Sequence, residues 1–293
     1  MTKQWAILEA LTWTEQRLAR EGEENPRLAA QMLAAHATGL TRIELYAHFD
    51  KPLSDDERTI LRESIQRRLE GEPLQYIIGR TGFRHLELEV RPPVLIPRPE
   101  TELLVDLVIK QVAATTDPCT CLEIGTGTGA IALSLLHELP TCQVSATDID
   151  DAAIVLAGLN ARELDLDSCG RFKLSKDDLA SSFIANDDHH GYFDVVVSNP
   201  PYIPTAEYLE LPKEILSHES RLALDGGVDG LEVLRRLTEQ AAVLLKSGGL
   251  LAVELHENTL EEAAKHLCTL PFECIQIHQD LTQRNRFLTA FKA

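Results

Sequence analysis

Residues 121–129 read Cys-Leu-Glu-Ile-Gly-Thr-Gly-Thr-Gly, an apolar run that ends in three glycines at alternate positions. The run predicts a buried strand over 119–124, and the residues after it predict a helix over 129–138. Glycine is needed where the backbone turns sharply and where a ligand approaches it closely. In a doubly wound α/β sheet this turn lies at the carboxyl end of the first strand, where ligands bind. The stretch therefore predicts a Rossmann-like fold with a ligand site at the turn.

On the C-terminal side of this stretch, short apolar strands alternate with helices. This alternation predicts a parallel sheet covered by helices on both faces. The last two strands are separated by a short segment, which predicts an antiparallel pair at one edge. Strands are expected near 119–124, 142–147, 171–174, 193–198, 249–255, 272–277 and 286–291, and helices at 129–138, 151–164, 228–246 and 257–268. Residues 99–293, which open with a helix from Glu100 to Val112, are thus predicted to form a seven-stranded α/β domain.

On the N-terminal side, residues 1–72 carry apolar side chains at helical spacing and no strand signal. Asn25-Pro26 and Ser54 mark two helix starts. We expect a small all-helical domain suited to gripping a partner. Residues 73–98 are predicted to be a β-hairpin-like connector, with strands at Tyr76–Ile78 and Leu86–Val90.

The composition restricts the classes of partner. The chain has 293 residues, a net charge of -18 and 44% hydrophobic residues. Proteins that bind duplex nucleic acid usually present a basic face to the phosphates, so this balance favours a protein or small-molecule substrate. We find no signal peptide and no apolar run of membrane-spanning length, which predicts a cytoplasmic protein without a membrane segment.

Cysteine and histidine offer weaker signals. The six cysteines, at 119, 121, 142, 169, 268 and 274, form no Cys-x-x-Cys pair. They are interpreted as small buried side chains in a reducing compartment, with a zinc or redox role as the alternative. Cys119 and Cys121 alternate along one strand and should face the same side of the sheet. His189 and His190 are expected to be solvated in a polar loop, and no metal site is predicted.

Three interpretations compete for the glycine loop. A nicotinamide-type loop has the spacing Gly-x-Gly-x-x-Gly, which this chain does not match. A tight turn without a ligand is the second possibility. The third is a loop for S-adenosyl-L-methionine, which is favoured because Asp148 follows the second strand and can accept both ribose hydroxyls. The carboxylate of Glu123, just before the loop, would suit the cationic ligand.

The fourth predicted strand, 193–198, is followed at once by Asn199-Pro200-Pro201-Tyr202. Two prolines fix two backbone φ angles and remove two N–H donors, so the corner presents only acceptors. The Asn199 side-chain oxygen and a proline carbonyl could hold both hydrogens of a planar NH2 group, with Tyr202 stacked on its face. The motif therefore predicts methylation of an amide or amine nitrogen.

Three further motifs complete the pattern: residues 71–79 read Gly-Glu-Pro-Leu-Gln-Tyr-Ile-Ile-Gly, residues 95–102 read Leu-Ile-Pro-Arg-Pro-Glu-Thr-Glu, and residues 226–231 read Gly-Gly-Val-Asp-Gly-Leu. With the glycine loop and Asn199–Tyr202, they resemble the HemK/PrmC-type release-factor glutamine methyltransferases over nearly the whole chain. The resemblance implies N5-methylation of the glutamine in the Gly-Gly-Gln motif of class 1 peptide chain release factors. It also implies S-adenosyl-L-methionine as cofactor, S-adenosyl-L-homocysteine as product, and no metal. We expect a monomer that does not bind nucleic acid directly.

Two alternatives remain open at this point. An adenine-N6 methyltransferase of RNA or DNA shares the Asn-Pro-Pro-Tyr motif, although the acidic balance opposes it. A non-catalytic adaptor that keeps the fold is the other, although the intact motif opposes that.

The resemblance carries roles onto matching positions. Asn199 and the Pro200 carbonyl would hold the glutamine amide, with Pro201 and Tyr202 beside it, and Asn199, Pro200 and Tyr202 would form the catalytic set. Leu95 and Thr101 would border the same site, Leu95 on the substrate side and Thr101 on the cofactor side. The cofactor would contact Glu123, Gly125, Thr126, Gly127, Thr128, Gly129, Asp148, Asp178, Leu179 and Asn199.

Three positions depart from the family pattern. Ser220 stands where a proline is usual, His256 follows the fifth strand where a glycine is usual, and Gln283 replaces a customary glycine. These changes flank the site, so we expect them to affect cofactor affinity or partner fit more than the type of reaction.

Overall fold

The computed structural model describes residues 5–112, 118–168 and 170–293. It divides the chain into two compact units, Met1–Arg80 and Thr81–Ala293. The division falls inside the connector predicted at 73–98, so the strand pair of that connector belongs mostly to the second unit.

The first unit is helical, as predicted, and consists of α1 (Ile7–Arg20), α2 (Pro26–Thr38), α3 (Arg42–Ala47), α4 (Asp55–Leu69) and α5 (Leu74–Ile78). The predicted helix starts are confirmed, since α2 begins at the proline after Asn25 and α4 at the residue after Ser54. Ser54 Oγ accepts from the Glu57 N–H at 3.2 Å, and Glu57 Oε2 accepts from the Ser54 N–H at 2.7 Å. This reciprocal cap satisfies two N–H groups at the start of α4. Buried aliphatic side chains from α1, α2 and α4 form the core.

The predicted strand at Tyr76–Ile78 is wrong, because these residues belong to the helix α5. Pro73 precedes the turn, and Gly79 ends it with φ +82 in the left-handed region. A proline at the start and a left-handed glycine at the end favour a single helical turn over an extended segment. The two-stranded sheet is instead formed by β1 (Arg80–Phe83) and β2 (Leu86–Glu89), so the second predicted connector strand is confirmed.

The second unit contains the predicted seven-stranded sheet, in the order β5-β4-β3-β6-β7-β9-β8. The first five strands in this order are parallel, and the antiparallel pair β8–β9 forms one edge, as expected. The strands are β3 (Thr120–Ile124), β4 (Gln143–Asp148), β5 (Phe172–Lys176), β6 (Phe193–Ser198), β7 (Leu245–Glu254), β8 (Phe272–Gln279) and β9 (Asn285–Lys292).

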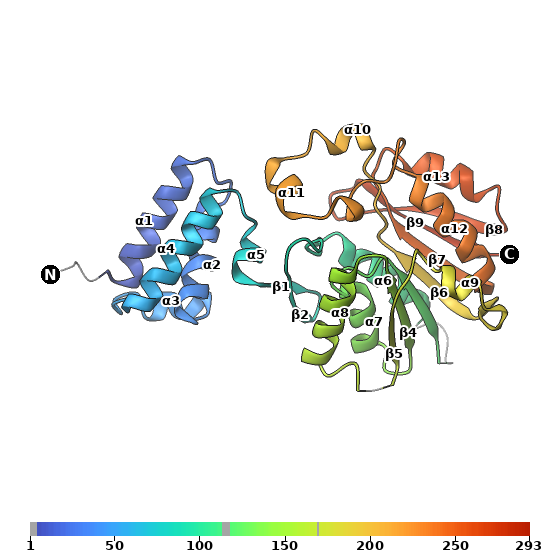
Figure 1. The fold of residues 1–293 in the computed structure, drawn as a ribbon, viewed down its shortest axis with the longest axis horizontal. Coiled ribbons are helices and arrows are strands. Elements are labelled where there is room, and N and C mark those ends of the chain that lie inside the picture. The colour runs from blue at the N-terminus through green and yellow to red at the C-terminus, as the bar shows by residue number, and fades with distance from the viewer. Residues whose placement is uncertain (1–4, 113–117, 169) are drawn as a thin grey trace. The chain divides into compact units, whose positions relative to one another are not determined.

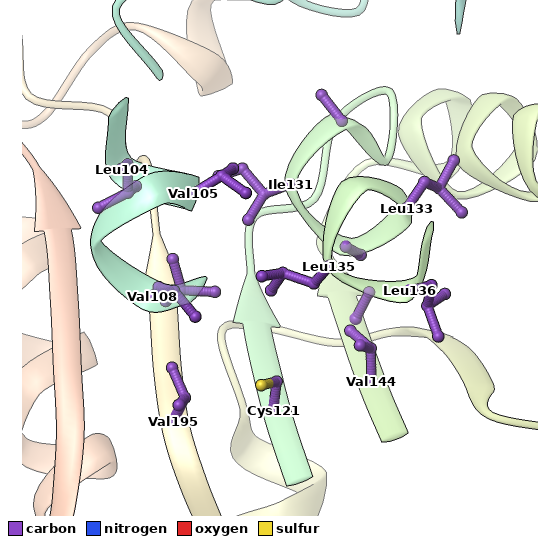
Figure 2. Packing of buried hydrophobic residues seen from close by; sticks show 14 of the residues in the cluster. Leu104, Val105, Val108, Cys121, Ile131, Leu133, Leu135, Leu136, Val144 and Val195 are labelled. Carbon is purple, nitrogen blue, oxygen red and sulfur yellow. The ribbon is translucent and has the colours of Figure 1, made fainter. Parts of the chain in front are cut away.

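Helices cover both faces of this sheet (Figure 1). Because successive side chains of a strand point to opposite faces, Cys121 packs on one side and Leu122 on the other. One side carries α6 (Thr101–Val112), α7 (Ala130–Glu138) and α8 (Asp151–Glu163), and Figure 2 shows the aliphatic side chains of α6 and α7 against β3, β4 and β6. The other side carries α12 (Glu232–Leu244) and α13 (Leu260–Leu267).

Several short elements were not expected from the sequence: α9 (Ser181–Ile184), η1 (Asp187–His189), α10 (Thr205–Tyr208), α11 (Lys213–His218) and η2 (Arg221–Ala223). Helix α12 begins at Glu232, four residues later than predicted, because 226–231 form a glycine-rich loop. Within the described part of the chain, no helix is both long and apolar enough to cross a membrane.

The predictions for cysteine and histidine were partly right. Cys119, Cys121 and Cys142 are buried, as expected, whereas Cys268 and Cys274 are exposed, and Cys169 lies outside the described residues. His190 is exposed, but the ring of His189 packs 4.9 Å from that of Phe183 and is only partly solvated. The polar loop forms the short 3-10 helix η1, which places the His189 ring against the rings of Phe183 and Phe193.

Candidate functional site

The carboxyl ends of three neighbouring strands form one edge of the sheet. Strand β3 pairs in parallel with β4 on one side and with β6 on the other. The glycine loop after β3, Asp148 at the end of β4 and Asn199 after β6 therefore lie side by side.

A cavity of about 560 Å³ opens at this edge. Its volume is in the usual range for small-molecule sites. Among the sequence-predicted site residues, it is lined by Leu95, Gly125, Gly127, Asp148, Asp178, Leu179, Asn199 and Pro201. The lining does not include the remaining predicted residues, Thr101, Glu123, Thr126, Thr128, Gly129, Pro200 and Tyr202.

The glycine loop is held by backbone hydrogen bonds to β4. The N–H groups of Gly125 and Thr126 both donate to Thr147 O at 2.9 Å. Gly127 has φ +56 and faces the cavity, where a side chain would fill space beside Val94. Gly129 serves packing instead, because a Cβ there would lie 3.0 Å from Leu133 Cδ1. The loop thus brings bare backbone to the cavity and seats α7 closely on the sheet.

Asp148 organises the floor of the cavity. Its Oδ2 accepts from the Gly127 N–H at 2.8 Å, and its Oδ1 accepts from the Asp150 N–H at 2.9 Å. Burial raises the pKa of this carboxyl, and the two backbone donors oppose that shift. Each oxygen retains a lone pair, since a carboxylate offers about four acceptor sites. Asp148 can therefore hold the loop and still accept hydrogen bonds from a ligand.

Glu123 lies behind the loop and has a bracing role. Its Oε2 accepts from Thr126 Oγ1 at 2.6 Å and from the Ala132 N–H at 3.0 Å, which joins the loop to the first turn of α7. Burial raises the pKa of Glu123 to about 8, although both hydrogen bonds favour the carboxylate. The side chain is 1% exposed, so any effect of Glu123 on a ligand acts through the loop.

The cavity walls are predominantly acidic. Two arginines accompany six acidic residues in the lining: Arg221 and Arg236, with Asp148, Asp150, Asp177, Asp178, Asp225 and Glu232. Asp178 pairs with Arg236 at 2.6 Å, and Asp225 pairs with Arg221 at 2.7 Å. Four carboxylates remain after these pairs, so the field in the cavity favours a ligand with positive charge.

Asn199 is positioned by two side chains from other elements. Its Nδ2 donates to Thr101 Oγ1 at 3.3 Å, and the Thr101 hydroxyl donates to Glu254 Oε2 at 2.7 Å. Thr101 opens α6, and Glu254 ends β7. Both are buried, at 4% and 1% exposure. The hydrogen-bearing end of the Asn199 amide is thereby directed at Thr101, which leaves Oδ1 on the opposite side of the amide group.

Pro200 is buried and Tyr202 is half-buried. Burial raises the pKa of the Tyr202 phenol to about 12, so the group stays protonated at neutral pH. Its ring lies 6.4 Å from that of His256, which occupies one of the positions that depart from the family pattern. His256 is therefore a neighbour of the Asn-Pro-Pro-Tyr corner.

The loop 226–231 fixes the backbone of this corner, a role that the sequence alone did not reveal. A Cβ at Gly226 would lie 2.7 Å from Pro201 O, and one at Gly230 would lie 2.4 Å from Tyr202 O. Only glycine allows such close approach of two backbone segments. The Gly226 N–H also donates to Ile203 O at 2.8 Å. The signal was present in the sequence as glycines at 226, 227 and 230, but not the identity of the segment they approach.

The proline-rich segment is tied to Glu219 and Ser220, and Leu95 and Ser220 both line the cavity. Both oxygens of Glu219 accept from Arg98 Nη2, at 2.8 and 2.7 Å. Burial raises the pKa of Glu219, and Arg98 opposes the shift. The Ser220 N–H donates to Pro93 O at 2.8 Å. These contacts hold Leu95 and Ser220 in place as parts of one lining.

Comparison with known proteins gives consistent results over both units. Residues 9–79 match the PrmC N-terminal domain model, and residues 100–228 match the methyltransferase small domain model. A release factor glutamine methyltransferase of Moorella thermoacetica is 41% identical over 297 residues, covering 100% of this chain and 99% of that protein. The human MTRF1L release factor glutamine methyltransferase is 35% identical over 280 residues, covering 92% of this chain and 82% of that protein.

Solved structures support the fold of the second unit. A methyltransferase from Pyrococcus furiosus is similar with a TM-score of 0.51 at 22% identity, covering 71% of this chain and 90% of that chain. The catalytic domain of human Mettl16, solved with an RNA hairpin, is similar with a TM-score of 0.55 at 17% identity, covering 70% of this chain and 75% of that chain. At these identities the likeness concerns the fold alone.

Proposed function

The chain belongs to the release factor glutamine methyltransferase family, and from this premise we propose that it transfers a methyl group from S-adenosyl-L-methionine to the glutamine side chain in the Gly-Gly-Gln motif of class 1 peptide chain release factors. The proposal rests on the orientation of the Asn199 amide. Asn199 lines the cavity, and Thr101 and Glu254 hold its NH2 end away from the proposed substrate side. That arrangement presents an acceptor oxygen where a substrate amide needs one.

The cavity fits the proposed cofactor. Its volume of about 560 Å³ and its unpaired carboxylates suit a ligand with a sulfonium and an ammonium group. Gly125 and Gly127 would approach the methionine part, Asp148 would accept the ribose hydroxyls, and Asp178 and Leu179 would border the adenine. When bound, the cofactor supplies an electrophilic methyl group on sulfur.

The chain's own residues would orient the acceptor nitrogen. An amide nitrogen is a weak nucleophile because its lone pair is delocalised into the carbonyl. Asn199 Oδ1 and the Pro200 carbonyl would accept its two N–H bonds and hold it toward the cofactor side of the cavity. Orientation of this kind can lower a barrier by several kcal/mol, up to about 7–11 in intramolecular models. The consecutive prolines keep the corner rigid and free of competing donors.

Tyr202 would pack against the substrate amide without acting as a base. At neutral pH its phenol is protonated, since burial raises its pKa to about 12. A strong base is not required, because an N-methylated amidium loses its proton readily once it forms.

The two domains are proposed to have different roles. We assign partner recognition to the helical domain, predicted at residues 1–72, and catalysis to the domain predicted at 99–293. Because the proposed substrates are translation factors, we place the protein in the cytoplasm, acting as a monomer without a metal ion. An acidic cavity and a net charge of -18 oppose the adenine-N6 alternative, since a nucleic acid would be repelled.

A direct experiment combines the purified protein with methyl-labelled cofactor and a recombinant release factor. Label is expected on the wild-type factor and is expected to be absent after Gln→Ala in its Gly-Gly-Gln motif. Label that persists on the altered factor would refute the proposed target residue.

A further inference from the structure

We propose that Glu254, acting through Thr101, determines which end of the Asn199 amide faces the substrate. This inference rests on the proposed function and adds two positioning residues to it. Neither would touch the reacting atoms, and both would act through Asn199.

The Thr101 hydroxyl carries one hydrogen, and it is used in the 2.7 Å bond to Glu254 Oε2. An ionised carboxylate can only accept, so it forces the hydroxyl to donate toward it. The remaining lone pairs of Thr101 Oγ1 can accept only from the NH2 end of Asn199. As long as Glu254 is ionised, Asn199 Oδ1 must point the other way.

Protonation of Glu254 would remove this constraint. A carboxylic acid can donate to Thr101, and the threonine hydrogen is then free to point at Asn199. The asparagine amide could then turn its oxygen toward Thr101 and present NH2 to the substrate. Two donors facing each other would repel the substrate amide, so transfer should depend on ionised Glu254.

The groups around Glu254 place this change near neutral pH. Burial is the largest influence and raises the pKa of Glu254 to about 7. Glu100, next to α6, acts in the same direction, whereas Thr101, Arg98 and Arg286 on β9 oppose it. Tyr202 is neutral in this range. The carboxylate fraction should therefore rise from about one tenth at pH 6 to about nine tenths at pH 8.

The test measures kcat, KM and cofactor affinity for three variants. Thr101→Val should lower kcat by about three- to tenfold, the equivalent of one net hydrogen bond, with cofactor affinity unchanged. Thr101→Ser keeps the hydroxyl and should restore kcat. Wild-type kcat should rise about tenfold from pH 6 to pH 8, and Glu254→Gln should abolish that rise because its amide does not titrate in this range. Wild-type kcat in Thr101→Val, or an unchanged pH profile in Glu254→Gln, would overturn the proposal.

A second readout is independent of turnover. The side-chain amide resonances of Asn199, followed by ¹⁵N NMR, should shift between pH 6 and pH 8 in the wild type but not in Glu254→Gln. If the wild type transfers no methyl group to any release factor, the proposed function fails. The NMR shift would still test whether Glu254, acting through Thr101, controls the orientation of the Asn199 amide. If the Asn199 resonances do not shift with pH in either protein, the role of Glu254 and Thr101 is overturned, whereas the proposed function is not affected.

A different observation concerns three thiols at the amino end of the sheet. Cys119 Sγ lies 2.7 Å from Cys142 Sγ and 3.9 Å from Cys121 Sγ, and Cys121 and Cys142 are 3.4 Å apart. All three are buried, and Cys119 is the most exposed at 4%. Cys119 and Cys142 face each other in register, because the pair Thr120–Gln143 follows them along β3 and β4. Figure 2 shows Cys121 on β3, beneath the side chains of α6 and α7.

We infer that Cys119 and Cys142 form a reversible disulfide when the protein meets an oxidised low-molecular-weight disulfide such as oxidised glutathione. Neighbouring strands lie about 4.7–4.9 Å apart, within the Cα separations that a disulfide accepts. The Cys119 thiolate would attack one sulfur of the reagent and release one glutathione thiol. Cys142, on losing its proton, would then attack Cys119 Sγ and release the second, so that two protein thiols are oxidised and one disulfide is reduced. Cys119 is the most exposed of the three thiols, which favours it as the attacking group.

The test uses full-length protein in which Cys169, Cys268 and Cys274 are serine. Incubation with oxidised glutathione should remove two thiols per molecule, and peptide mapping should show Cys119 joined to Cys142. Cys142→Ser in the same background should give at most a mixed disulfide. Retention of all three thiols would overturn the inference, and so would zinc binding with thiolate absorbance from all three, which would assign a metal site instead.

Discussion

Replacing Asp148 by asparagine should weaken cofactor binding, because the two oxygens of Asp148 hold the loop and can also accept hydrogen bonds from a ligand. In the wild type, one oxygen accepts from the Gly127 N–H and the other from the Asp150 N–H, at 2.8 and 2.9 Å. Each oxygen keeps a lone pair for a ligand hydroxyl. In Asp148→Asn the NH2 group must face one of these N–H donors, so one backbone hydrogen bond and one ligand acceptor are lost together.

A hydrogen bond to a charged group contributes about 1.5–3 kcal/mol. Asp148→Asn should therefore weaken cofactor binding by about 10- to 150-fold. Isothermal titration with S-adenosyl-L-methionine and S-adenosyl-L-homocysteine measures this change directly. Both ligands should lose affinity similarly, because they share the ribose.

Asp151→Asn provides the matched control. Asp151 lies in the first turn of α8, pairs with Lys176 at 2.6 Å and has a side chain that is 78% exposed. The change removes the same charge from the same region without altering the cavity lining, so affinity should stay within about twofold. Equal affinity of Asp148→Asn and the wild type would refute the ribose assignment.

Three further predictions concern stability. The folded state binds the Glu123 proton more tightly than the unfolded chain, because burial raises the folded pKa to about 8. The stability contributed by this proton is full below pH ~4.5 and is lost as the pH rises through 8, a decline of about 5 kcal/mol in the free energy of unfolding. Glu123→Gln should flatten this decline when unfolding is measured in urea, and a pH dependence equal to wild type would contradict the burial argument. Gln283 has φ +65, in the left-handed region that strains a residue with a side chain. Gln283→Gly should therefore raise the melting temperature by about 1–4 °C. A lower melting temperature would show that no strain is stored there. Ser220 has φ −66 and Glu219 before it is extended, so the backbone at both residues already suits a proline at position 220. Ser220→Pro loses the hydrogen bond to Pro93 O but restricts the unfolded chain. The two effects on the free energy of unfolding should cancel to within about 1 kcal/mol in urea denaturation.

The parts of the fold that the sequence predicts are those set by local pattern. Periodicity predicts the apolar strands of the sheet. Because ligands bind at the carboxyl ends of parallel strands, it also follows that the glycine loop after β3 and Asn199 after β6 lie at the site. The short turn at Tyr76–Ile78 was misassigned because three apolar residues fit a strand and a helical turn equally well. Only the flanking Pro73 and the left-handed Gly79 decide between them.

The contacts that organise the site depend on residues far apart in the sequence. Thr101 is predicted to border the cofactor. The structure adds that its hydroxyl accepts from Asn199, 98 positions away, and donates to Glu254, 153 positions away. No local pattern encodes such a pairing, because it exists only once β6, β7 and α6 have packed. The same holds for Gly226 and Gly230, whose spacing signals close approach but not the segment approached.

The departures from the family pattern acquire physical explanations from the structure. Ser220 keeps a backbone conformation suited to proline while it donates to Pro93 O. The ring of His256 lies 6.4 Å from that of Tyr202 in the Asn-Pro-Pro-Tyr corner. Gln283 adopts the left-handed conformation that a glycine would accept without strain. Of the three, Ser220 lines the same cavity as Asn199, whereas His256 and Gln283 are not part of its lining.

The central claim is that two oxygens of the Asn-Pro-Pro-Tyr corner hold a glutamine NH2 for methylation. The most direct measurement compares wild type with Asn199→Ala in single-turnover methylation of a release factor, read by the mass of its Gly-Gly-Gln peptide, with cofactor affinity measured in parallel. We expect Asn199→Ala to bind the cofactor as the wild type does and to transfer the methyl group about 100-fold more slowly or worse, because orientation is lost. Transfer at a rate comparable to wild type, or methyl label on a residue other than the glutamine, would contradict the account.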